Sequence, residues 1–354
     1  SPLAHAAMRH ALQPKMRRVD DPLVDLAVYH ARLQGELGLV NNDLIQLYEY
    51  YFFNGNGYYN RGMKDEALAY YRRATQILPK RAKPWIMLGT ILFNRKQFDE
   101  SAEAYRKLVA LQPDNDLHHS RLGIGLTQAG RPHEAIPVFR AAIKLNPESS
   151  DLQNRLATAL NNSAWDLVKE PTDKSVAQQA VKLGTEGTEL TPKKWTVWHT
   201  LGVAQYRAGN WQEAVDALEK SMTLKSGGDC HDWFFVAMAR WQLGQQEEAR
   251  QLYEKSVAWM DEHMSEDNYA LAFRAEAELL IKHNGPASIP RDRGTYMIRS
   301  VQSNKRLGVA TNESDVVLDA WSEPHVIWML EQVEDGFRIT NTDNDLVLGV
   351  AGKE

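Results

Sequence analysis

Three prolines of this chain, Pro79, Pro113 and Pro147, follow one another at intervals of 34 residues. The same classes of residue precede each of them in the same order: Tyr51, Gly55, Tyr58, Ala67 and Tyr71 before the first; Trp85, Leu88, Gly89, Leu92, Ser101 and Tyr105 before the second; Leu122, Gly123, Leu126, Ala135 and Phe139 before the third. A fixed period of this size is typical of proteins built from stacked supersecondary units. The sequence therefore predicts a repeat protein.

Each period has the pattern of a pair of helices. Large residues at its fourth, seventh and eleventh positions share one face of a first helix, and a small residue at the eighth position lets a second helix approach closely. On the second helix a small and an aromatic residue stand four apart, as Ala67 and Tyr71 do, and lie on one stripe. The proline ends that helix. One pair cannot bury its apolar face alone, so we expect the pairs to stack.

The repeat is interrupted once and then resumes. Pro192 follows Pro147 after 45 residues, so 11 residues are extra, and we expect them to lengthen a helix over about Asp151–Leu167 and to loosen the turn near residue 171. Two further units read Trp198, Leu201, Gly202, Tyr206, Gly209, Ala214 and Leu218, then Trp233, Val236, Ala237, Gly244, Ala249 and Tyr253. A last helix near Tyr269–Ile281 is expected to cover the end of the stack.

These units resemble the tetratricopeptide repeat (TPR), whose pattern is W-x2-L-G-x2-Y, then A-x3-F, then P. The resemblance covers residues 43–282, with an insertion near 148–172. It implies a mainly α fold, a right-handed superhelix of helix pairs whose concave groove binds a peptide or a partner domain. The stretch Trp198–Met260 is most similar to TPR regions that accompany kinases in bacterial signalling proteins. No V-A-I-K, H-R-D or D-F-G element of a kinase occurs in this sequence.

The character of the sequence changes after Lys282. Residues 283–293 contain Gly285, Pro286 and Pro290, which indicates a linker. In residues 294–354, short alternating apolar segments are separated by Asn, Asp and Gly, a pattern typical of strands. The predicted strands are Tyr296–Val301, Val316–Leu318, Val326–Leu330, Phe337–Ile339 and Leu346–Val350.

This C-terminal segment also repeats itself, with an offset of 41 residues. Tyr296, Ile298, Leu307 and Val309 recur as Phe337, Ile339, Leu348 and Val350. It resembles one and a half lobes of a ricin B-type β-trefoil, so we expect a small, incomplete all-β domain. Lobes of that type commonly place an Asp for sugar hydroxyls where this chain has Gly308 and Gly349. Trefoils also serve as protease inhibitors, so a carbohydrate-binding and an inhibitor-like role both stay open.

Composition narrows the classes of function. The net charge of -5 over 354 residues argues against a nucleic-acid binder, and no apolar run approaches the ~18 residues that span a bilayer. The single Cys230 excludes an internal disulfide. Residues 1–42 read as a helical segment, clearest over Leu23–Leu37, that fits no repeat. Because residue 1 is Ser, we expect a processed or truncated N-terminus, and a cytoplasmic location is the expectation.

No catalytic constellation is apparent in the sequence. His118 and His119 are adjacent and point apart on a helix, so they do not predict a metal site. Cys230 and His231 are also neighbours and cannot form a nucleophile and base pair. We therefore predict a protein that is not an enzyme and that uses no metal and no cofactor.

The resemblance also implies which residues touch a partner, because positions 2, 5, 9, 12 and 13 of each first TPR helix face the concave surface. The first three units supply Phe52, Asn56, Tyr59, Asn60, Lys83, Phe93, Asn94 and Arg121; the later units supply His199, Tyr206, Arg207, His231, Phe234, Met238 and Trp241. The second set is rich in aromatic and soft side chains, which give contact area at little entropic cost. The later units are therefore the predicted centre of binding.

We predict a non-enzymatic scaffold for a protein or peptide partner, with carbohydrate binding by residues 294–354 as the alternative. Recognition of an EEVD-type tail is not expected, because Phe52, Met87 and Leu117 replace clamp residues of chaperone-binding TPRs. Replacing Phe234 and Trp241 together by Ala is expected to remove partner binding without unfolding the protein.

Overall fold

The structure, a computed structural model, describes residue 29, residues 42–282 and the backbone of seven strands between residues 295 and 349. The helices of residues 42–282 are α3 (Asn42–Asn60), α4 (Lys64–Ile77), α5 (Ala82–Asn94), α6 (Phe98–Leu111), α7 (Asp116–Gln128), α8 (Pro132–Leu145), α9 (Ser150–Val168), α10 (Lys174–Leu190), α11 (Trp195–Ala208), α12 (Trp211–Leu224), α13 (Cys230–Gln242), α14 (Gln246–His263) and α15 (Asn268–Lys282).

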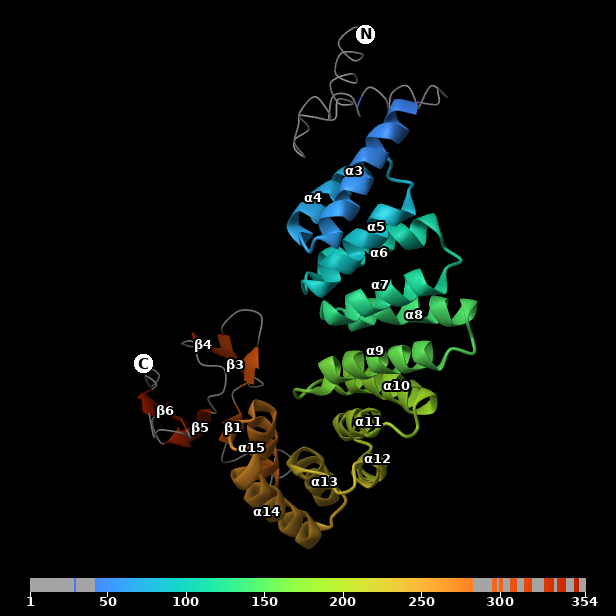
Figure 1. Cartoon of the computed structure of the whole chain (residues 1–354). Helices are drawn as coiled ribbons and strands as arrows, with labels where there is room; N and C mark the ends of the chain where they lie inside the picture. The colour runs from blue at the N-terminus through green and yellow to red at the C-terminus, as the bar shows by residue number, and fades with distance from the viewer. Residues whose placement is uncertain are drawn as a thin grey trace. The chain divides into compact units, whose positions relative to one another are not determined.

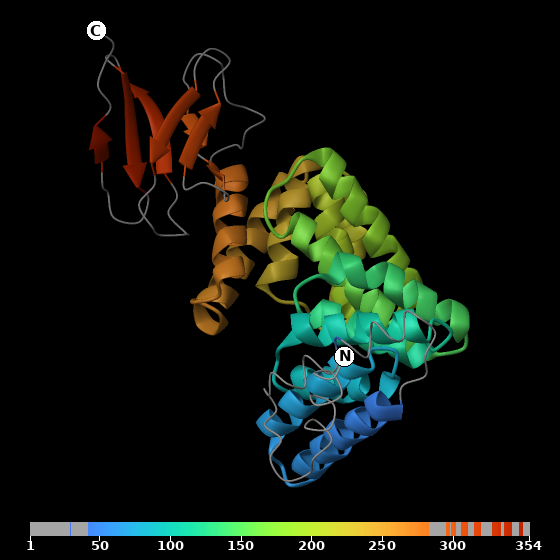
Figure 2. The ribbon, with the colours of Figure 1, turned by 90° about the horizontal axis from the view of Figure 1, so that it is seen from above.

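The chain divides into two compact units, Ser1–Ala204 and Gln205–Glu354. In the first unit, each helix from α3 to α10 packs against the helix that follows it, as the ribbons of Figures 1 and 2 show. This order of contacts, pair by pair along the sequence, is that of a solenoid. The 34-residue period therefore corresponds to one helix pair, as predicted.

The eighth-position glycines explain how closely the two helices of a pair approach. A β-carbon added at these glycines would lie 2.9 Å from the ring of Tyr71 for Gly55, 2.8 Å from that of Tyr105 for Gly89, and 2.6 Å from that of Phe139 for Gly123. Carbon atoms do not approach one another that closely without displacement. Glycine therefore makes room for the aromatic ring of the second helix, which confirms the packing predicted from the repeat pattern.

A residue in the left-handed region closes the turn between the two helices of a pair. Gly62, Gly130, Gly209 and Gly244 have φ angles of 79°, 74°, 84° and 82°. Lys96 takes the corresponding place in the second pair, with φ 60°. A β-carbon disfavours this conformation, so the backbone is strained at Lys96 and relaxed at the glycines.

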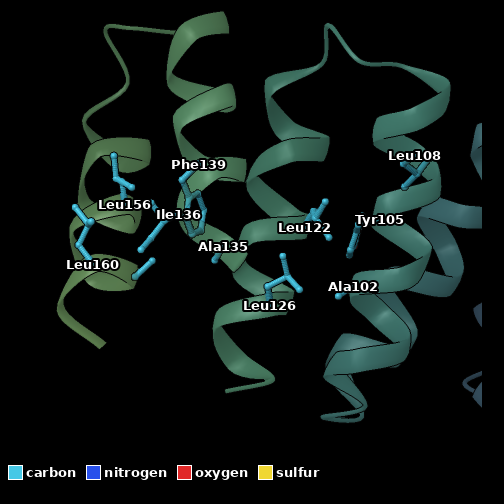
Figure 3. Close-up of a cluster of buried hydrophobic side chains, with 11 residues drawn as sticks. Ala102, Tyr105, Leu108, Leu122, Leu126, Ala135, Ile136, Phe139, Leu156 and Leu160 are labelled. Atoms are coloured by element: carbon cyan, nitrogen blue, oxygen red, sulfur yellow. The ribbon is translucent and has the colours of Figure 1, made fainter. Parts of the chain in front are cut away.

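The hydrophobic core of the first unit lies both inside pairs, as between α3 and α4, and between successive pairs, as from α6 to α9 (Figure 3). Its largest cluster comprises Ala102, Tyr105 and Leu108 of α6, Leu122 and Leu126 of α7, Ala135, Ile136 and Phe139 of α8, and Leu156, Ala159 and Leu160 of α9. Because these side chains come from four consecutive helices, each pair buries its apolar face only when its neighbours are present.

The pair after Pro147 is longer than the pairs before it. Helix α9 has 19 residues and α10 has 17, whereas each helix from α5 to α8 has 13 or 14. The turn between α9 and α10 occupies residues 169–173. The extra residues of this interval thus extend both helices of one pair.

In the second unit, α13 is the central helix. It packs against α12, α14 and α15. Helix α15 begins at Asn268 and ends at Lys282, close to the range expected for a terminal helix. It makes more contact with α13, the first helix of its neighbouring pair, than with α14, the second. Helix α15 therefore covers a face of α13.

Seven strands follow: β1 (Thr295–Met297), β2 (Arg299–Val301), β3 (Arg306–Ala310), β4 (Asp315–Asp319), β5 (Trp328–Val333), β6 (Gly336–Asn341) and β7 (Val347–Gly349), drawn in red tones in Figure 2. They pair antiparallel in one sheet of order β1-β5-β6-β7 and another of order β2-β3-β4. The alternating segments did predict strands here. Two separate open sheets give no support to the β-trefoil resemblance, because the lobes of a trefoil pair around one common barrel.

Candidate functional site

The first helices of the first three pairs present a common surface, which we call the α3–α5–α7 face. It carries the predicted groove residues Phe52, Asn56, Tyr59, Asn60, Lys83, Phe93, Asn94 and Arg121. Asn60, Lys83 and Asn94 are exposed, while the other five are half-buried. Of these, Phe93 packs edge-on against Phe98, with 5.3 Å between ring centres. The structure thus gathers this predicted set on helices of one unit.

Hydrogen bonds between the two helices of a pair hold the residue at the ninth position of the first TPR helix, which is Asn56 in the first pair and Thr90 in the second. The Tyr71 hydroxyl donates to Asn56 Oδ1 at 2.7 Å, and Thr90 and Tyr105 share a hydrogen bond of 3.1 Å at the corresponding place. Burial, with a smaller effect of neighbouring Tyr59, raises the pKa of Tyr71 to about 12. Its hydroxyl therefore stays protonated and remains a donor at neutral pH.

Arg121 brings a positive charge to the same face. Its guanidinium donates to Thr90 Oγ1 at 3.3 Å and to the Tyr105 hydroxyl at 3.1 Å, and it lies 5.8 Å from the centre of the Tyr105 ring. All of these partners are neutral. Among the described residues no carboxylate lies within 4 Å of it, so its charge is not neutralised.

A cavity of about 500 Å³ lies at one end of the α3–α5–α7 face. Its apolar lining comes from Tyr48, Phe52 and Phe53 of α3, and from Leu111 at the end of α6. Tyr48 and Phe52 stack in parallel at 5.8 Å, whereas Phe53 exposes 63% of its surface. A volume of this size is within the range of protein ligand pockets, so the cavity can take up one or two apolar side chains of a partner.

Three basic side chains border this cavity. Lys80 and Arg81 come from the turn between α4 and α5, and Lys83 comes from the first turn of α5, while Glu49 is the only acidic residue in the lining. All four side chains are exposed. Within residues 42–282, none of the three basic residues forms an ion pair, although the Arg81 guanidinium lies 6.0 Å from the centre of the Tyr48 ring. The border of the cavity is therefore positively charged.

Most arginines of the second helices, by contrast, are paired. Ion pairs join consecutive second helices or the turns that lead into them: Arg72 with Glu100 at 2.6 Å, Arg131 with Asp99 at 3.0 Å, and Arg140 with Glu186 at 2.6 Å. These arginines have carboxylate partners, whereas Lys80, Arg81 and Lys83 form no ion pair within residues 42–282. Lysines without an ion pair in this range also occur on the second helices, Lys64 and Lys107 among them, so the distinguishing feature of the site is a group of three basic residues beside an aromatic lining.

The predicted groove residues of the later units are placed differently. His199 packs against Trp165, with ring centres 5.7 Å apart. Phe234 and Met238 are fully buried and Tyr206 is 8% exposed, so these three side chains are core residues. We predicted that they would line an open groove, and that prediction is wrong for this structure. The physical reason is that α12, α14 and α15 all pack on α13, which carries Phe234 and Met238. The ring centre of Phe234 lies 6.0 Å from that of Tyr253 of α14, and that of Tyr206 of α11 lies 5.4 Å from that of Phe235.

Specific contacts hold α15 against the rest of the second unit. The Arg207 guanidinium, only 5% exposed, forms a two-pronged ion pair with the Glu276 carboxylate of α15, with 2.7 Å between Nη2 and Oε2. The rings of Phe235 and Phe273 meet edge to face at 4.8 Å. Predicted groove residue Arg207 thus already has a carboxylate partner within its own chain.

His231 is the second polar link to α15. Its Nε2 lies 3.1 Å from Asp267 Oδ1, and its Nδ1 lies 3.5 Å from Asp229 Oδ1. Burial on its own would favour the neutral ring, but the hydrogen bonds and charges of the two carboxylates outweigh it and raise the pKa of His231. The imidazolium is therefore stabilised between two anions.

Two further predicted site positions can be placed. Trp241 is half-buried, and the Arg250 guanidinium lies 5.0 Å from its ring centre. Cys230 is buried, and burial together with the charges of Asp229 and Asp267 raises its pKa to about 12. A thiol in this state is protonated at neutral pH and is a poor nucleophile.

The two adjacent histidines of α7 are structural. His118 Nε2 lies 2.8 Å from Gln112 Oε1, and His119 Nε2 lies 2.8 Å from the Pro113 carbonyl oxygen. In the described residues no group of three or more His, Cys, Asp or Glu side chains could hold a metal ion. No helix within residues 42–282 has the length and hydrophobicity needed to cross a membrane.

Sequence reasoning missed Tyr48, Lys80, Arg81 and Leu111, because these residues lie outside the helix positions that the repeat pattern assigns to a groove. A signal was present in the printed sequence. The segment 80–83 holds three basic residues directly after Pro79 and no acidic one. Corresponding segments after Pro113 and Pro147 contain Asp114 and Glu148 instead.

Comparisons with known proteins identify the repeats. Family profiles described as tetratricopeptide repeat match residues 48–81, 82–115, 121–163, 198–222 and 233–259. These matches confirm the tetratricopeptide repeats predicted from the sequence, and such repeats form scaffolds that are typically non-catalytic. None of the profile matches reaches residues 294–354, so the ricin-type resemblance and carbohydrate binding have no support. No curated protein matches the chain in sequence.

Solved structures with related repeats are also similar to this chain. YrrB, described as a TPR protein with an unusual peptide-binding site, is 19% identical over 50% of this chain and 85% of its own, with a TM-score of 0.38. MamA from Desulfovibrio magneticus RS-1 is 18% identical over 51% of this chain and 95% of its own, with a TM-score of 0.36. PilW, a type IV pilus biogenesis factor, is 16% identical over 65% of this chain and 98% of its own, with a TM-score of 0.39.

Proposed function

We propose that this chain is a non-enzymatic scaffold that binds an extended segment of a partner protein on the α3–α5–α7 face. The observation that carries the proposal is the cavity of about 500 Å³, whose aromatic lining is bordered by basic side chains that have no ion-pair partner in the described residues. Apolar recesses with a few fixed polar groups around them are the usual form of a binding site.

The rest of the face suits an extended segment. Asn60 and Asn94 occupy the same position in consecutive pairs and are exposed. A side-chain amide offers both donors and an acceptor, so two amides at a regular spacing can pair with the backbone of a bound chain. The helices beneath them are fixed by the hydrogen bonds of Asn56 and Thr90, which reduces the ordering cost of binding.

The second unit is not the proposed site. Its equivalent positions on α13, Phe234 and Met238, are fully buried, and Arg207 and His231 have carboxylate partners within the unit. A partner would have to displace those contacts before it could reach Phe234 or Met238. The first unit needs no such displacement among its described residues.

A selection from a library of random 12-residue peptides displayed on phage, with the full chain as bait, tests the proposal. The hydrogen exchange of the chain is then measured with and without a synthetic copy of an enriched peptide. We expect slower exchange in α3, α5 and α7 and no change in α12, α13 and α14. Protection confined to the second unit would contradict the proposed site.

A pair of variants supplies the matched control. Phe53→Ser shortens a side chain that lines the cavity, and Leu145→Ser shortens one at the end of α8 that does not; both side chains are exposed, by 63% and 41%. We expect about a fivefold loss of peptide affinity for Phe53→Ser, since truncating an aromatic residue at the centre of an interface costs about 1 kcal/mol or more. Leu145→Ser should leave the affinity unchanged. Equal losses in both variants would contradict the proposal.

A further inference from the structure

We infer that the segment bound at the cavity is acidic and carries an aromatic or large aliphatic side chain, with the apolar side chain in the cavity and carboxylates beside Lys80, Arg81 and Lys83. This inference rests on the proposed function and adds the chemical class of the partner. Two properties of the cavity support it: an apolar lining and a positively charged border.

The apolar lining sets the first requirement. Tyr48 is 7% exposed and stacks with Phe52, so the floor of the cavity is a fixed aromatic surface. Leu111 closes it from α6. A polar side chain placed there would lose water without gaining hydrogen-bond partners, whereas an aromatic or aliphatic one would gain contact with the rings.

The border sets the second requirement. Three basic residues face one acidic residue, Glu49, and nothing in residues 42–282 pairs with the three. Like charges held close together repel one another, and an anionic partner relieves that repulsion. Arg121, further along the same face, has only neutral partners as well. The face thus selects against basic segments and favours acidic ones.

The second unit contains a contact with the same chemistry. There Glu276 and Phe273 of α15 contact Arg207 and Phe235, and Asp267, the residue directly before α15, contacts His231. An acidic and aromatic segment thus covers a basic and aromatic face of a repeat helix. The contact is internal, and it illustrates which combination of side chains a face of this kind accepts.

Charge argues against residues 9–18 of the chain's own N-terminal segment as the occupant. Residues 9–18 contain Arg9, Lys15, Arg17 and Arg18 and no acidic residue. A basic segment beside Lys80, Arg81 and Lys83 would add to the repulsion. Residues 20–26 contain Asp20, Asp21 and Asp25, so this argument excludes the basic stretch alone. We assign the cavity to a separate acidic peptide segment because its border is basic.

The composition of the peptides enriched by the full chain tests the inference directly. We expect at least two Asp or Glu residues next to an aromatic or large aliphatic residue in most of them. A synthetic peptide with the enriched sequence is then titrated by fluorescence anisotropy against three proteins: the unmodified chain, Lys80→Glu/Lys83→Glu, and the control Lys64→Glu/Lys107→Glu. The control residues are exposed on α4 and α6 and lie outside the cavity lining, and the change of charge is the same.

The reversed variant should bind the peptide at least about tenfold more weakly, and the control variant within about twofold of the unmodified chain. Binding to the unmodified chain should also weaken as salt is raised. Circular dichroism and thermal melting of both variants show whether each is folded, since all four substituted side chains are exposed.

Other outcomes would overturn the inference. Enriched peptides that are neutral or basic, with binding still lost in Phe53→Ser, would refute the acidic class and leave the proposed function intact. Failure to enrich any peptide would refute both. A concentration-dependent dimer that Lys80→Glu/Lys83→Glu dissociates, seen by light scattering, would assign the cavity to a second copy of this chain instead.

Discussion

The attachment of α15 to α13 should depend on pH through His231, and the substitution His231→Gln tests this. Glutamine can place its side-chain nitrogen near the position of Nε2 and still donate to Asp267, but it carries no charge. The variant therefore removes the titration and leaves a hydrogen bond. The nearby groups that carry charge are Asp229, which pairs with Lys225, and Asp267.

The direction in which the stability of the α15 contact changes with pH follows from the direction of each pKa shift. The pKa of His231 is raised, so its stabilising effect is complete below the ordinary histidine pKa of about 6.5 and is lost as the pH rises through the raised value. The pKa values of Asp229 and Asp267 are lowered, so their effect is complete above about 3.9 and is lost as the pH falls through the lowered values. Helix α15 should therefore be held most firmly between about pH 4 and pH 6.5.

The free-energy contribution of the His231–Asp267 contact is modest because both side chains are partly exposed. A hydrogen bond to a charged group contributes about 1.5–3 kcal/mol when it is well buried. The side chains of His231 and Asp267 are 21% and 32% exposed, so screening reduces the contribution to about 1 kcal/mol. One kcal/mol corresponds to about a fivefold change in the opening equilibrium of α15.

Hydrogen exchange of the α15 amides, corrected for the intrinsic pH dependence of exchange, measures this equilibrium. Protection in the unmodified chain should fall about fivefold between about pH 5.5 and pH 8.5, and His231→Gln should show no such fall. His133→Gln, an exposed histidine of the first unit, is the control and should behave as the unmodified chain does. A fall of the same size in His231→Gln would refute the reasoning.

Three further changes test the packing by urea denaturation. Phe234→Ala should lower the free energy of unfolding by about 3–5 kcal/mol because the side chain is fully buried, and half-buried Trp241→Ala should cost less than half of that; equal costs would argue that Phe234 is not in the core. Lys96→Gly should raise the stability by about 0.5 kcal/mol because it relieves a positive φ, whereas Lys96→Ala, which keeps a β-carbon, should not. Gly123→Ala should destabilise by about 1–3 kcal/mol, and Gly57→Ala, with open space at its β-carbon, should not; similar melting temperatures for the two would contradict the close helix contact.

The helix contacts inside one repeat were predictable from the sequence because they depend on residues within one 34-residue period. The eighth-position glycines and the aromatic residues sixteen positions later are encoded side by side, and the structure brings each pair into contact. Strands after residue 294 were likewise predictable from alternation, except β3 (Arg306–Ala310), which was not among the predicted strands. Their pairing was not, because alternation indicates which residues form a strand and does not specify which strand lies next to it.

The burial of Phe234 and Met238 was not predictable by transferring groove positions from the repeat family. That transfer assumes that no other element covers the first helix of a pair. Here a helix outside the repeat pattern packs on α13; its Glu276 pairs with Arg207, and Asp267, the residue directly before it, pairs with His231. The abundance of aromatic residues in the later units, which suggested a binding surface, is explained by this added layer of core.

The same consideration strengthens the case for the first unit. An aromatic side chain on a repeat helix has two explanations, core or partner, and charge helps to distinguish them. Where the partner is internal, as at Arg207, the compensating carboxylate is found in the same chain. Around the cavity the aromatic surface is present, but no carboxylate of residues 42–282 forms an ion pair with Lys80, Arg81 or Lys83, and Glu49 is the one acidic residue in the lining. A basic border beside an apolar recess favours an anionic partner with an apolar side chain, and this is the basis for expecting an acidic partner there.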